Sequence, residues 1–200
     1  MNENCIVENE SLGKLLAAID ERLAKGLTIV AIDGRCASGK STLAAHLAEI
    51  YDCNVFHTDD FFLQPKQRTA QRLAIAGENI DHERFNDEVL VPLSEGKTIH
   101  YRRYNCHLQT IESHVEFQPK KLTIIEGAYC LHPDLAGFYD IKIALDVEPK
   151  TQMERIRKRN TPAMAERFAN EWIPLEERYF EAFSVYQNVD MVLALKSCGM

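Results

Sequence analysis

The residues of this chain that are best suited to chemistry run from Gly34 to Ser41, with the sequence GRCASGKS. They match the pattern G-x-x-x-x-G-K-[ST] at every fixed position, which predicts a loop that binds phosphate groups. Gly34 and Gly39 allow backbone conformations and close approaches that a side chain would block. Successive backbone N–H groups can then point inward and form a nest for an anion. We expect a nucleotide to bind here through Gly34, Ala37, Ser38, Gly39, Lys40, Ser41 and Thr42.

The segments on either side of the loop supply the rest of such a site. Residues 29–32 form a short apolar run typical of a buried strand, and residues 42–50 favour a helix. The helix would offer its first N–H groups and the positive end of its dipole to the phosphates. Lys40 adds a positive charge for the β- and γ-phosphates, and the Ser41 hydroxyl is placed to bind Mg²⁺. The alternative is a glycine-rich turn without a ligand, but the flanking strand and helix favour a site for ATP and Mg²⁺.

Carboxylates follow two further predicted strands. Residues 54–57 suit a short strand that delivers Asp59 and Asp60 to a strand end, where open α/β sheets bind ligands. Adjacent aspartates are common in turns, but phosphoryl transfer needs a carboxylate near the acceptor and the metal. Glu126 ends the apolar strand that begins at Leu122. A buried charge is costly there unless it is paired or bound to a metal.

Three polar segments are open to two interpretations each. Asp81 can cap a helix, and this role is compatible with ligand binding. The cluster YRRY at 101–104 could be a solvated strand face or a wall for a planar polar ligand. The predicted helix at 149–160 carries four basic residues near its end, where such side chains are usually solvated and suit the helix dipole. Those residues are Arg155, Arg157, Lys158 and Arg159.

A single domain of the α/β class would position these groups. Apolar runs predict strands at 29–32, 54–57, 122–127, 141–147 and 191–195. Helical patterns lie at 11–25, 42–50, 66–76, 81–93, 149–160 and 174–183, and a further helix restarts at Thr161–Pro162. Strands that alternate with helices indicate a parallel sheet with crossover connections. We expect a P-loop NTPase fold over residues 1–200: a three-layer αβα sandwich with a five-stranded parallel sheet, an antiparallel hairpin insertion at 97–118 and a helical lid region at 149–185.

Length, charge and composition narrow the class of protein. The chain has 200 residues, which suit one domain with a full core. Its net charge of −7 argues against nucleic acid or a membrane surface as a partner. No apolar run could span a bilayer, and the acidic N-terminus lacks the pattern of a signal peptide. We expect a cytoplasmic protein whose partner is a small-molecule phosphate acceptor, and a homo-oligomer stays open.

The cysteines and histidines show no metal-binding spacing. The six cysteines form no C-x-x-C pair, and we interpret them as reduced thiols: Cys5, Cys36, Cys53, Cys106, Cys130 and Cys198. The seven histidines form no H-E-x-x-H motif, so the sequence predicts no zinc site.

Several separated segments together resemble one family, the uridine kinase and phosphoribulokinase-like P-loop kinases, which include nicotinamide riboside kinases. The resemblance spans residues 29–195 and is carried by GRCASGKS, HTDDFFL, NIDHERF, YRRYNC, IIEGAYCL, ERIRKRN and WIPLEERYF. The first motif occurs in many NTPases, whereas the combination in this order is more specific. The chain departs from the family at Phe62, where tyrosine is usual, and at Tyr104–Cys106, which replaces Y-D-F. The histidine that follows in uridine kinases has no clear counterpart.

The resemblance implies roles for individual residues. Asp59 corresponds to the carboxylate that accepts the proton of the acceptor hydroxyl, and Glu126 to the acid that assists Ser41 in holding Mg²⁺. Arg155 and Lys158 correspond to lid residues that embrace the transferring phosphate, so the expected catalytic set is Asp59, Lys40, Arg155 and Lys158. The expected acceptor-binding set is Asp59, Phe62, Asp81, Tyr101, Arg103 and Tyr104.

The activity that the resemblance implies is transfer of the γ-phosphate of ATP to the 5′-hydroxyl of a ribonucleoside, with uridine or cytidine expected first. Nicotinamide riboside and other small alcohols such as pantothenate are alternative acceptors. A regulatory ATPase that transfers phosphate only to water, or an inactive nucleotide-binding module, is a different class. The joint presence of Lys40, Ser41, Asp59 and Glu126 speaks against the inactive module.

Overall fold

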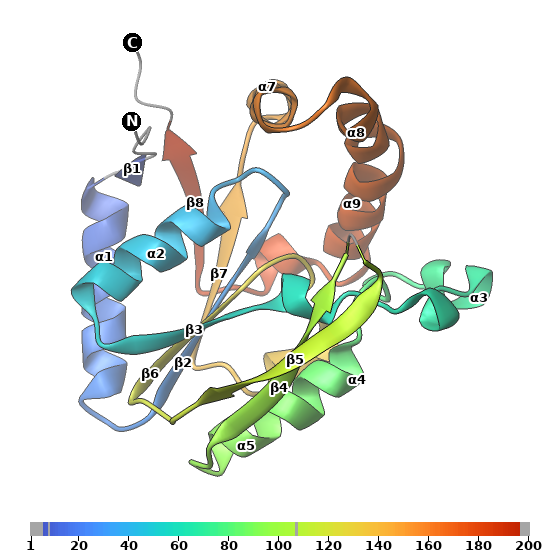
Figure 1. Cartoon of the computed structure of the whole chain (residues 1–200). Coiled ribbons are helices and arrows are strands. Elements are labelled where there is room, and N and C mark those ends of the chain that lie inside the picture. Colours follow the sequence, from blue (N-terminus) through green and yellow to red (C-terminus); the bar gives the residue numbers. More distant parts are fainter. Residues whose placement is uncertain (1–5, 8, 107, 197–200) are drawn as a thin grey trace.

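The computed structural model describes residues 6–7, 9–106 and 108–196, and its central feature is one mixed sheet (Figure 1). The strands are β1 (Ile6–Val7), β2 (Thr28–Gly34), β3 (Cys53–His57), β6 (Leu122–Glu126), β7 (Ile141–Asp146) and β8 (Met191–Lys196). Their spatial order is β1-β8-β7-β2-β6-β3. The last five of these run parallel, which confirms the predicted sheet, and β1 pairs antiparallel with β8 at one edge. The edge strand has no sequence signal, because two residues show no periodicity.

Helices cover both faces of this sheet. On one face α1 (Asn9–Leu23) and α2 (Lys40–Ile50) bury Leu15 and Leu47 against Val30 of β2. On the other face Ile29 of β2 enters a separate core, which includes Phe85. Because successive side chains of a strand point to opposite faces, neighbouring residues of β2 belong to two different cores. The predicted three-layer αβα sandwich is confirmed.

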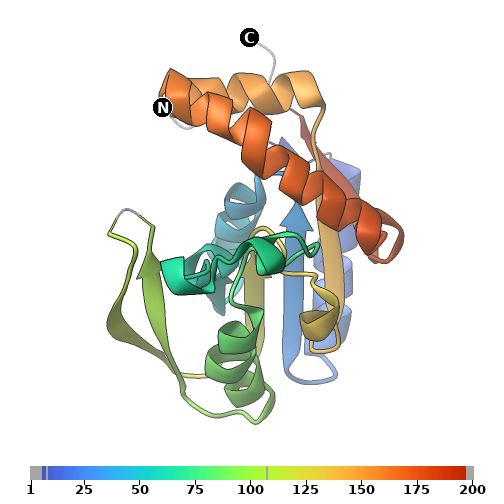
Figure 2. The same ribbon diagram turned by 90° about the vertical axis from the view of Figure 1, so that its right-hand side faces the viewer.

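The remaining elements form three groups. Between β3 and β6 lie η1 (Thr58–Phe61), η2 (Pro65–Gln67), α3 (Ala70–Leu73), α4 (His82–Phe85), η3 (Asn86–Leu90), α5 (Val91–Ser94), β4 (Ile99–Asn105) and β5 (Thr110–Phe117). Between β6 and β7 lies α6 (Pro133–Ala136). Between β7 and β8 lie α7 (Pro149–Arg159), α8 (Pro162–Arg167), η4 (Phe168–Trp172), α9 (Ile173–Ala182) and η5 (Val185–Gln187). Figure 2 shows α7, α8 and α9 crossing above the end of the sheet toward which β2 points.

The predicted antiparallel insertion is a two-stranded hairpin of β4 and β5. Its inner face is part of the core, because Tyr101 packs against the rings of Phe56, Phe61 and Phe117 at centroid distances of 5.8, 5.2 and 6.1 Å. The hairpin is therefore fixed to the end of β3 by aromatic packing.

Two helical segments contain a widened π turn two residues before a proline. The π turn η3 precedes Pro92 in the segment 82–94, and η4 precedes Pro174 in the segment 162–182. Proline lacks an N–H group, and its ring collides with the carbonyl four residues earlier. A π turn shifts that carbonyl and lets the helix continue. The helix predicted to begin or kink at Pro174 is thus the continuation of α8.

The helix predicted over 66–76 is wrong in extent. Only Ala70–Leu73 is α-helical, after the short turn η2. Arg68 has a non-helical ψ of 55°, and Thr69 starts a new turn by accepting a hydrogen bond from the Arg72 N–H at 3.1 Å. A capping threonine inside an apparently helical pattern therefore divides the segment.

The described part of the chain holds four of the six cysteines, and these form no disulfide: Cys36, Cys53, Cys106 and Cys130. Cys5 and Cys198 lie outside the described residues. Among the helices of the described ranges, none combines the length and the apolar character needed to cross a membrane.

Candidate active site

The predicted phosphate-binding loop forms the turn between β2 and α2 (Figure 1). Gly34 has a φ of 133°, and a Cβ atom there would lie 2.0 Å from the carbonyl oxygen of Leu145, so only glycine fits. Ala37 and Gly39 also have positive φ, 60° and 108°. Such left-handed residues turn neighbouring N–H groups toward a common centre. Gly39 is the N-cap of α2 and has no side chain to cap it, so the first N–H groups of α2 remain available to an anion.

Lys40 folds back over this loop. Its Nζ donates hydrogen bonds to the carbonyl oxygens of Gly34, at 2.7 Å, and Arg35, at 3.1 Å. The two carbonyls hold the ammonium group at the mouth of the nest. The ammonium charge is therefore in position before any phosphate arrives.

The outer side of the loop is held by α9. Arg35 donates two hydrogen bonds to Glu177, at 2.6 and 2.8 Å, and forms an ion pair with Asp146 at the end of β7. The Cys36 N–H donates to Glu176 at 2.9 Å, and burial raises the pKa of that carboxyl group. Three side chains thus fix two variable positions of the loop. Sequence reasoning gave these residues no individual role.

The predicted metal ligands lie together. The Ser41 hydroxyl donates to Glu126 Oε1 at 3.0 Å, and His57 Nδ1 lies 2.5 Å from the same oxygen. The strand register explains this geometry, because His57 of β3 pairs directly with Glu126 of β6. The hydrogen bond to Glu126 raises the pKa of His57. A hydroxyl and a carboxylate are oxygen donors of the kind that Mg²⁺ prefers, so this pair fits the expected ion.

A cavity of about 560 Å³ extends from the loop toward the hairpin and the helices above the sheet. Nine of the predicted residues line it: Ala37, Gly39, Lys40, Ser41, Thr42, Asp59, Phe62, Tyr104 and Glu126. Two more belong to the loop behind its wall: Gly34 and Ser38.

Asp59, the predicted acceptor-side carboxylate, lines this cavity. Its side chain is open to the cavity, but the protein that surrounds it excludes much of the bulk water and raises the pKa of the carboxyl group. The charge of Lys40 opposes this rise, and that of Glu126 adds to it. The neighbouring Asp60 has other partners, since it accepts a hydrogen bond from the Tyr101 hydroxyl and forms an ion pair with Arg103. The two adjacent aspartates therefore have different environments.

Tyr101 and Arg103 do not line the cavity, although the sequence suggests them as acceptor ligands. The Tyr101 ring is 1 % exposed, and its hydroxyl donates to Asp60 at 2.8 Å. Arg103 Nε lies 3.3 Å from the same carboxylate. In this structure both residues fix the hairpin to η1, and an acceptor contact by either stays a prediction.

Asp81 is buried, does not line the cavity and has two partners in the chain. It caps α4 by accepting the Arg84 N–H at 3.1 Å, and it accepts a hydrogen bond from Gln67 Nε2 at 2.7 Å. The capping role is confirmed. A contact between Asp81 and a sugar hydroxyl stays a prediction, and it would require exchange of the Gln67 contact.

Among the basic residues that the sequence places near the end of α7, Arg159 lines the cavity, whereas the expected Arg155 and Lys158 do not. Arg155 of α7 donates to the carbonyl oxygen of Ala37 at 3.0 Å, and neither it nor Lys158 lines the cavity. Arg159 of α7, Arg167 of α8 and Arg68 of the segment before α3 do line it. The sequence gives no signal for Arg68 and Arg167, because they face the cavity only after distant segments come together. The roles expected for Arg155 and Lys158 stay predictions.

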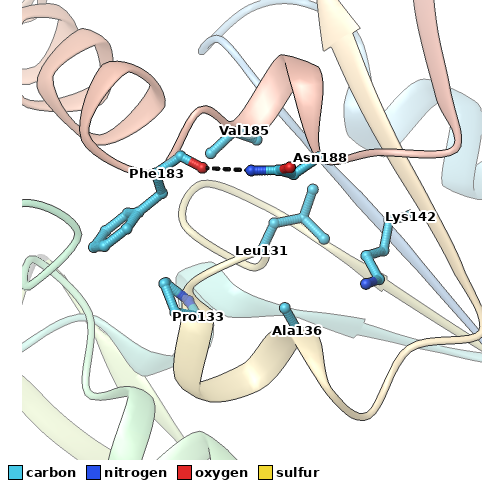
Figure 3. A pocket seen from close by; sticks show the side chains of 7 residues that line it. All are labelled: Leu131, Pro133, Ala136, Lys142, Phe183, Val185 and Asn188. Atoms are coloured by element: carbon cyan, nitrogen blue, oxygen red, sulfur yellow. Dashed lines mark hydrogen bonds between the residues drawn. The ribbon is translucent and has the colours of Figure 1, made fainter.

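A second, smaller cavity lies away from these groups (Figure 3). It has a volume of about 190 Å³ and a largely apolar wall, with Phe183, Val185 and Asn188 on one side and Leu131, Pro133 and Ala136 on the other. Lys142 reaches its edge. None of the predicted site residues lines it.

No protein-family model matches the chain. Among solved structures, a proposed fructose transport system kinase from Silicibacter sp. TM1040 is similar with 26 % identity and a TM-score of 0.70, over 90 % of this chain and 98 % of that one. A possible uridine kinase from Bacillus stearothermophilus is similar with 21 % identity and a TM-score of 0.65, also over 90 % of this chain and 98 % of that one. The chain has a P-loop kinase-like fold. This fold accounts for the carboxylate after β3 and the acid at the end of β6, because both lie at the strand ends that flank the loop.

Proposed function

We propose that this protein is an ATP- and Mg²⁺-dependent kinase that phosphorylates the 5′-hydroxyl of a ribonucleoside, with uridine or cytidine as the expected acceptor. One observation carries the kinase assignment. The Asp59 carboxylate, which is open to the cavity, lines it together with the phosphate-binding loop and with Lys40, Ser41 and Glu126. A module that only binds nucleotide has no need of a carboxylate on the far side of the phosphates.

The residues suggest a division of roles. Asp59 would orient the acceptor hydroxyl and accept its proton as the hydroxyl oxygen attacks the γ-phosphorus and the bond to the leaving ADP oxygen breaks. Lys40 and the expected lid residues Arg155 and Lys158 would balance the charge of the moving phosphoryl group. Ser41 and Glu126 would hold Mg²⁺, which when bound neutralises phosphate charge. Because the transition state is loose, positioning by these fixed groups should matter more than base strength.

The lining of the cavity supports a planar, polar acceptor. Aromatic side chains of Phe62, Tyr104, Phe168 and Trp172 line it together with the polar groups of Asn79 and Gln109. Aromatic rings offer stacking surfaces for a base, and amides offer hydrogen bonds for its edge or for ribose hydroxyls. These features fit a nucleoside, and they fit nicotinamide riboside equally.

A second candidate acceptor is a sugar or another small alcohol. Three arginines line the cavity, Arg68, Arg159 and Arg167, and positive charge beyond that needed for the phosphates of ATP would suit an anionic acceptor such as pantothenate. The similarity at 26 % identity to a proposed fructose transport system kinase favours testing sugars beside nucleosides. Pantothenate remains in the same group of alcohols.

The deciding experiment measures ADP release with uridine, cytidine, nicotinamide riboside, fructose and pantothenate, each against a water-only reaction. The proposal expects one or more ribosides to raise ADP release well above the water reaction and to yield a 5′-phosphate. Phosphorylation of a sugar or of pantothenate alone would overturn the nucleoside assignment and leave the kinase assignment. Equal ADP release in all reactions would favour the ATPase, and none at all would favour the inactive module.

Asp81 gives a prediction in which capping and acceptor binding can be separated. The D81A variant loses both the N-cap, worth roughly 1 kcal/mol, and the hydrogen bond from Gln67, so its folding free energy should fall by more than the cap alone, and it should bind the acceptor more weakly. The D81N variant keeps a capping oxygen, so its thermal unfolding should change less. If Asp81 contacts a ribose hydroxyl, both variants raise KM for the acceptor more than they lower kcat. An unchanged KM in D81N would limit Asp81 to its capping role.

A further inference from the structure

Three side chains with metal-binding chemistry lie close together outside the lining of the large cavity. They are Glu78 in the loop before α4, His82 at the start of α4, and His132 at the N-cap of α6. One potential ligand atom of each lies within 4.8 Å of the others. His82 and His132 are 6 % and 5 % exposed. Glu78 and His82 are four residues apart, whereas His132 is fifty residues further on, so the sequence spacing conceals this cluster.

The local packing holds the three side chains in place. Glu78 Oε1 lies 2.8 Å from His82 Nε2, and the rings of His82 and His132 stack with centroids 4.4 Å apart. Gly77 has a φ of 83°, and a Cβ atom there would lie 2.7 Å from the His132 ring. Glycine is therefore needed to bring the backbone that carries Glu78 against His132. Phe183 contacts the same ring edge to face, at 5.4 Å.

The charges around the cluster favour a cation. Asp134 Oδ2 lies 3.6 Å from His82 Nδ1 and 3.8 Å from His132 Nδ1. Glu78 and Glu83 are partly neutralised by Arg72, which contacts both. Three carboxylates thus face one guanidinium and two imidazoles. With neutral imidazoles, the group carries a net negative charge that a divalent cation would balance.

We propose that Glu78, His82 and His132 form a binding site for a zinc-type divalent cation, with water at the fourth position. Two imidazoles and a carboxylate are ligands typical of Zn²⁺ sites, whereas Mg²⁺ prefers oxygen alone. Zinc–ligand bonds of about 2.0–2.2 Å place tetrahedral ligand atoms about 3.4 Å apart. Binding would therefore draw the three side chains closer together than they are here.

The second ring nitrogen of each histidine, Nδ1, lies close to the Asp134 carboxylate but slightly beyond hydrogen-bond distance, at 3.6 Å for His82 and 3.8 Å for His132. A metal-bound histidine usually donates its other N–H to a carboxylate or carbonyl, and Asp134 can accept from His82 Nδ1. His132 Nδ1 accepts the Asp134 N–H at 3.3 Å, so in this tautomer the ring proton is on Nε2. Metal binding through Nε2 would move that proton to Nδ1, which would end the hydrogen bond from the Asp134 N–H and leave Nδ1 to donate to the Asp134 carboxylate, which lies 3.8 Å away and would have to move closer.

The expected consequence is structural. The metal would join the loop at 77–82 to the loop that follows β6. Asn79 on the first loop and Tyr129 on the second both line the large cavity. A cation here would therefore stiffen the acceptor wall from outside, and it would not take part in phosphoryl transfer. The proposal does not depend on which acceptor the protein uses.

The test is calorimetric titration of the apo protein with ZnCl₂ in excess MgCl₂, so that Mg²⁺ competes for the oxygen ligands of the loop site. We expect one equivalent of Zn²⁺ in the wild type and in E126Q, which removes the loop carboxylate. H82N and H132N should bind Zn²⁺ at least about 10-fold more weakly, on the magnitude seen even for outer-shell changes. The matched control is H46Q, because His46 is an exposed histidine beside a glutamate, Glu49, on α2.

Thermal unfolding covers the case in which a histidine variant fails to fold. Zn²⁺ should raise the Tm of the wild type through mass action, and it should not raise that of E78Q, whose side chain is only partly buried. The visible spectrum of the Co²⁺-loaded wild type should show nitrogen ligation. The proposal would be overturned if E126Q bound no Zn²⁺, or if E78Q and the wild type bound Zn²⁺ equally.

Discussion

Replacing Lys40 with alanine should abolish phosphoryl transfer and leave the chain folded. The ammonium group is the one charge that the loop itself brings to the phosphates, and its two contacts are loop carbonyls at 2.7 and 3.1 Å. Loss of a single preorganised donor to developing negative charge commonly lowers kcat about 10²- to 10³-fold. Since Lys40 carries a full charge, we expect a loss of at least about 10³-fold.

The fold should survive this change because the Lys40 side chain is not part of either apolar core. The measurement is kcat by ADP release, with ATP affinity and thermal unfolding measured on the same preparations. K121A is a suitable control, because Lys121 is an exposed lysine at the opposite end of the sheet, just before β6. Activity in K40A that equals the activity of K121A would show that the loop does not handle the reacting phosphate.

The parts of this site that could be predicted from sequence are those set by local rules. The loop is contiguous, and its glycines, lysine and serine have fixed spacing between a strand and a helix. Asp59 and Glu126 follow from a second local rule, because each lies at or just after the end of an apolar strand, and parallel strands end at one edge of the sheet. The register then brings His57 beside Glu126. This pairing requires knowledge that β3 and β6 are neighbours, which the sequence does not state.

Long-range geometry decides what could not be predicted. Tyr101 and Arg103 are residue types that could line a ligand site. The hairpin instead buries Tyr101 in the core and places Arg103 in an ion pair with Asp60. Arg68 and Arg167 reach the cavity from segments about a hundred residues apart, and both contact Glu171. Helical periodicity shows which residues of α7 share a face, but it does not show which face points toward the cavity. The choice between Arg155 and Arg159 therefore depends on how α7 crosses the sheet end.

Replacing Asp59 with asparagine should lower kcat by roughly 10²-fold or more, the magnitude of a lost general base. Asparagine keeps the size of the side chain but cannot accept the proton of the acceptor hydroxyl. ATP affinity should change little, because the phosphates are held by the loop. The matched control is D60N at the adjacent residue, whose carboxylate serves Tyr101 and Arg103. D60N should lose stability through the hairpin contacts and keep most of its kcat.

Although D59N should lower kcat, it should raise the stability of the folded protein. The pKa of Asp59 is raised in the folded protein, chiefly by burial, so the folded state favours the protonated carboxyl group more than the unfolded state does. A raised pKa means that stability is greatest below the unfolded pKa and is lost as pH rises through the folded value. At pH values above the folded-state pKa the ionised carboxylate therefore destabilises the fold. D59N, which imitates the neutral form, should unfold at a higher temperature than the wild type.

The pH dependence makes this prediction specific to Asp59. The advantage of D59N in Tm should be largest above the raised pKa and should shrink as pH falls through that pKa, because the wild-type carboxyl group then becomes neutral as well. Over the same interval wild-type kcat should fall, since a protonated Asp59 cannot accept the hydroxyl proton. Thermal unfolding and kcat of wild type, D59N and D60N across this range supply both readouts. A D59N variant that is slow but less stable than the wild type at neutral pH would mean that Asp59 supports the fold and that its loss of rate is indirect. A variant that is slow and more stable fits a carboxylate kept ionised for catalysis at the expense of stability.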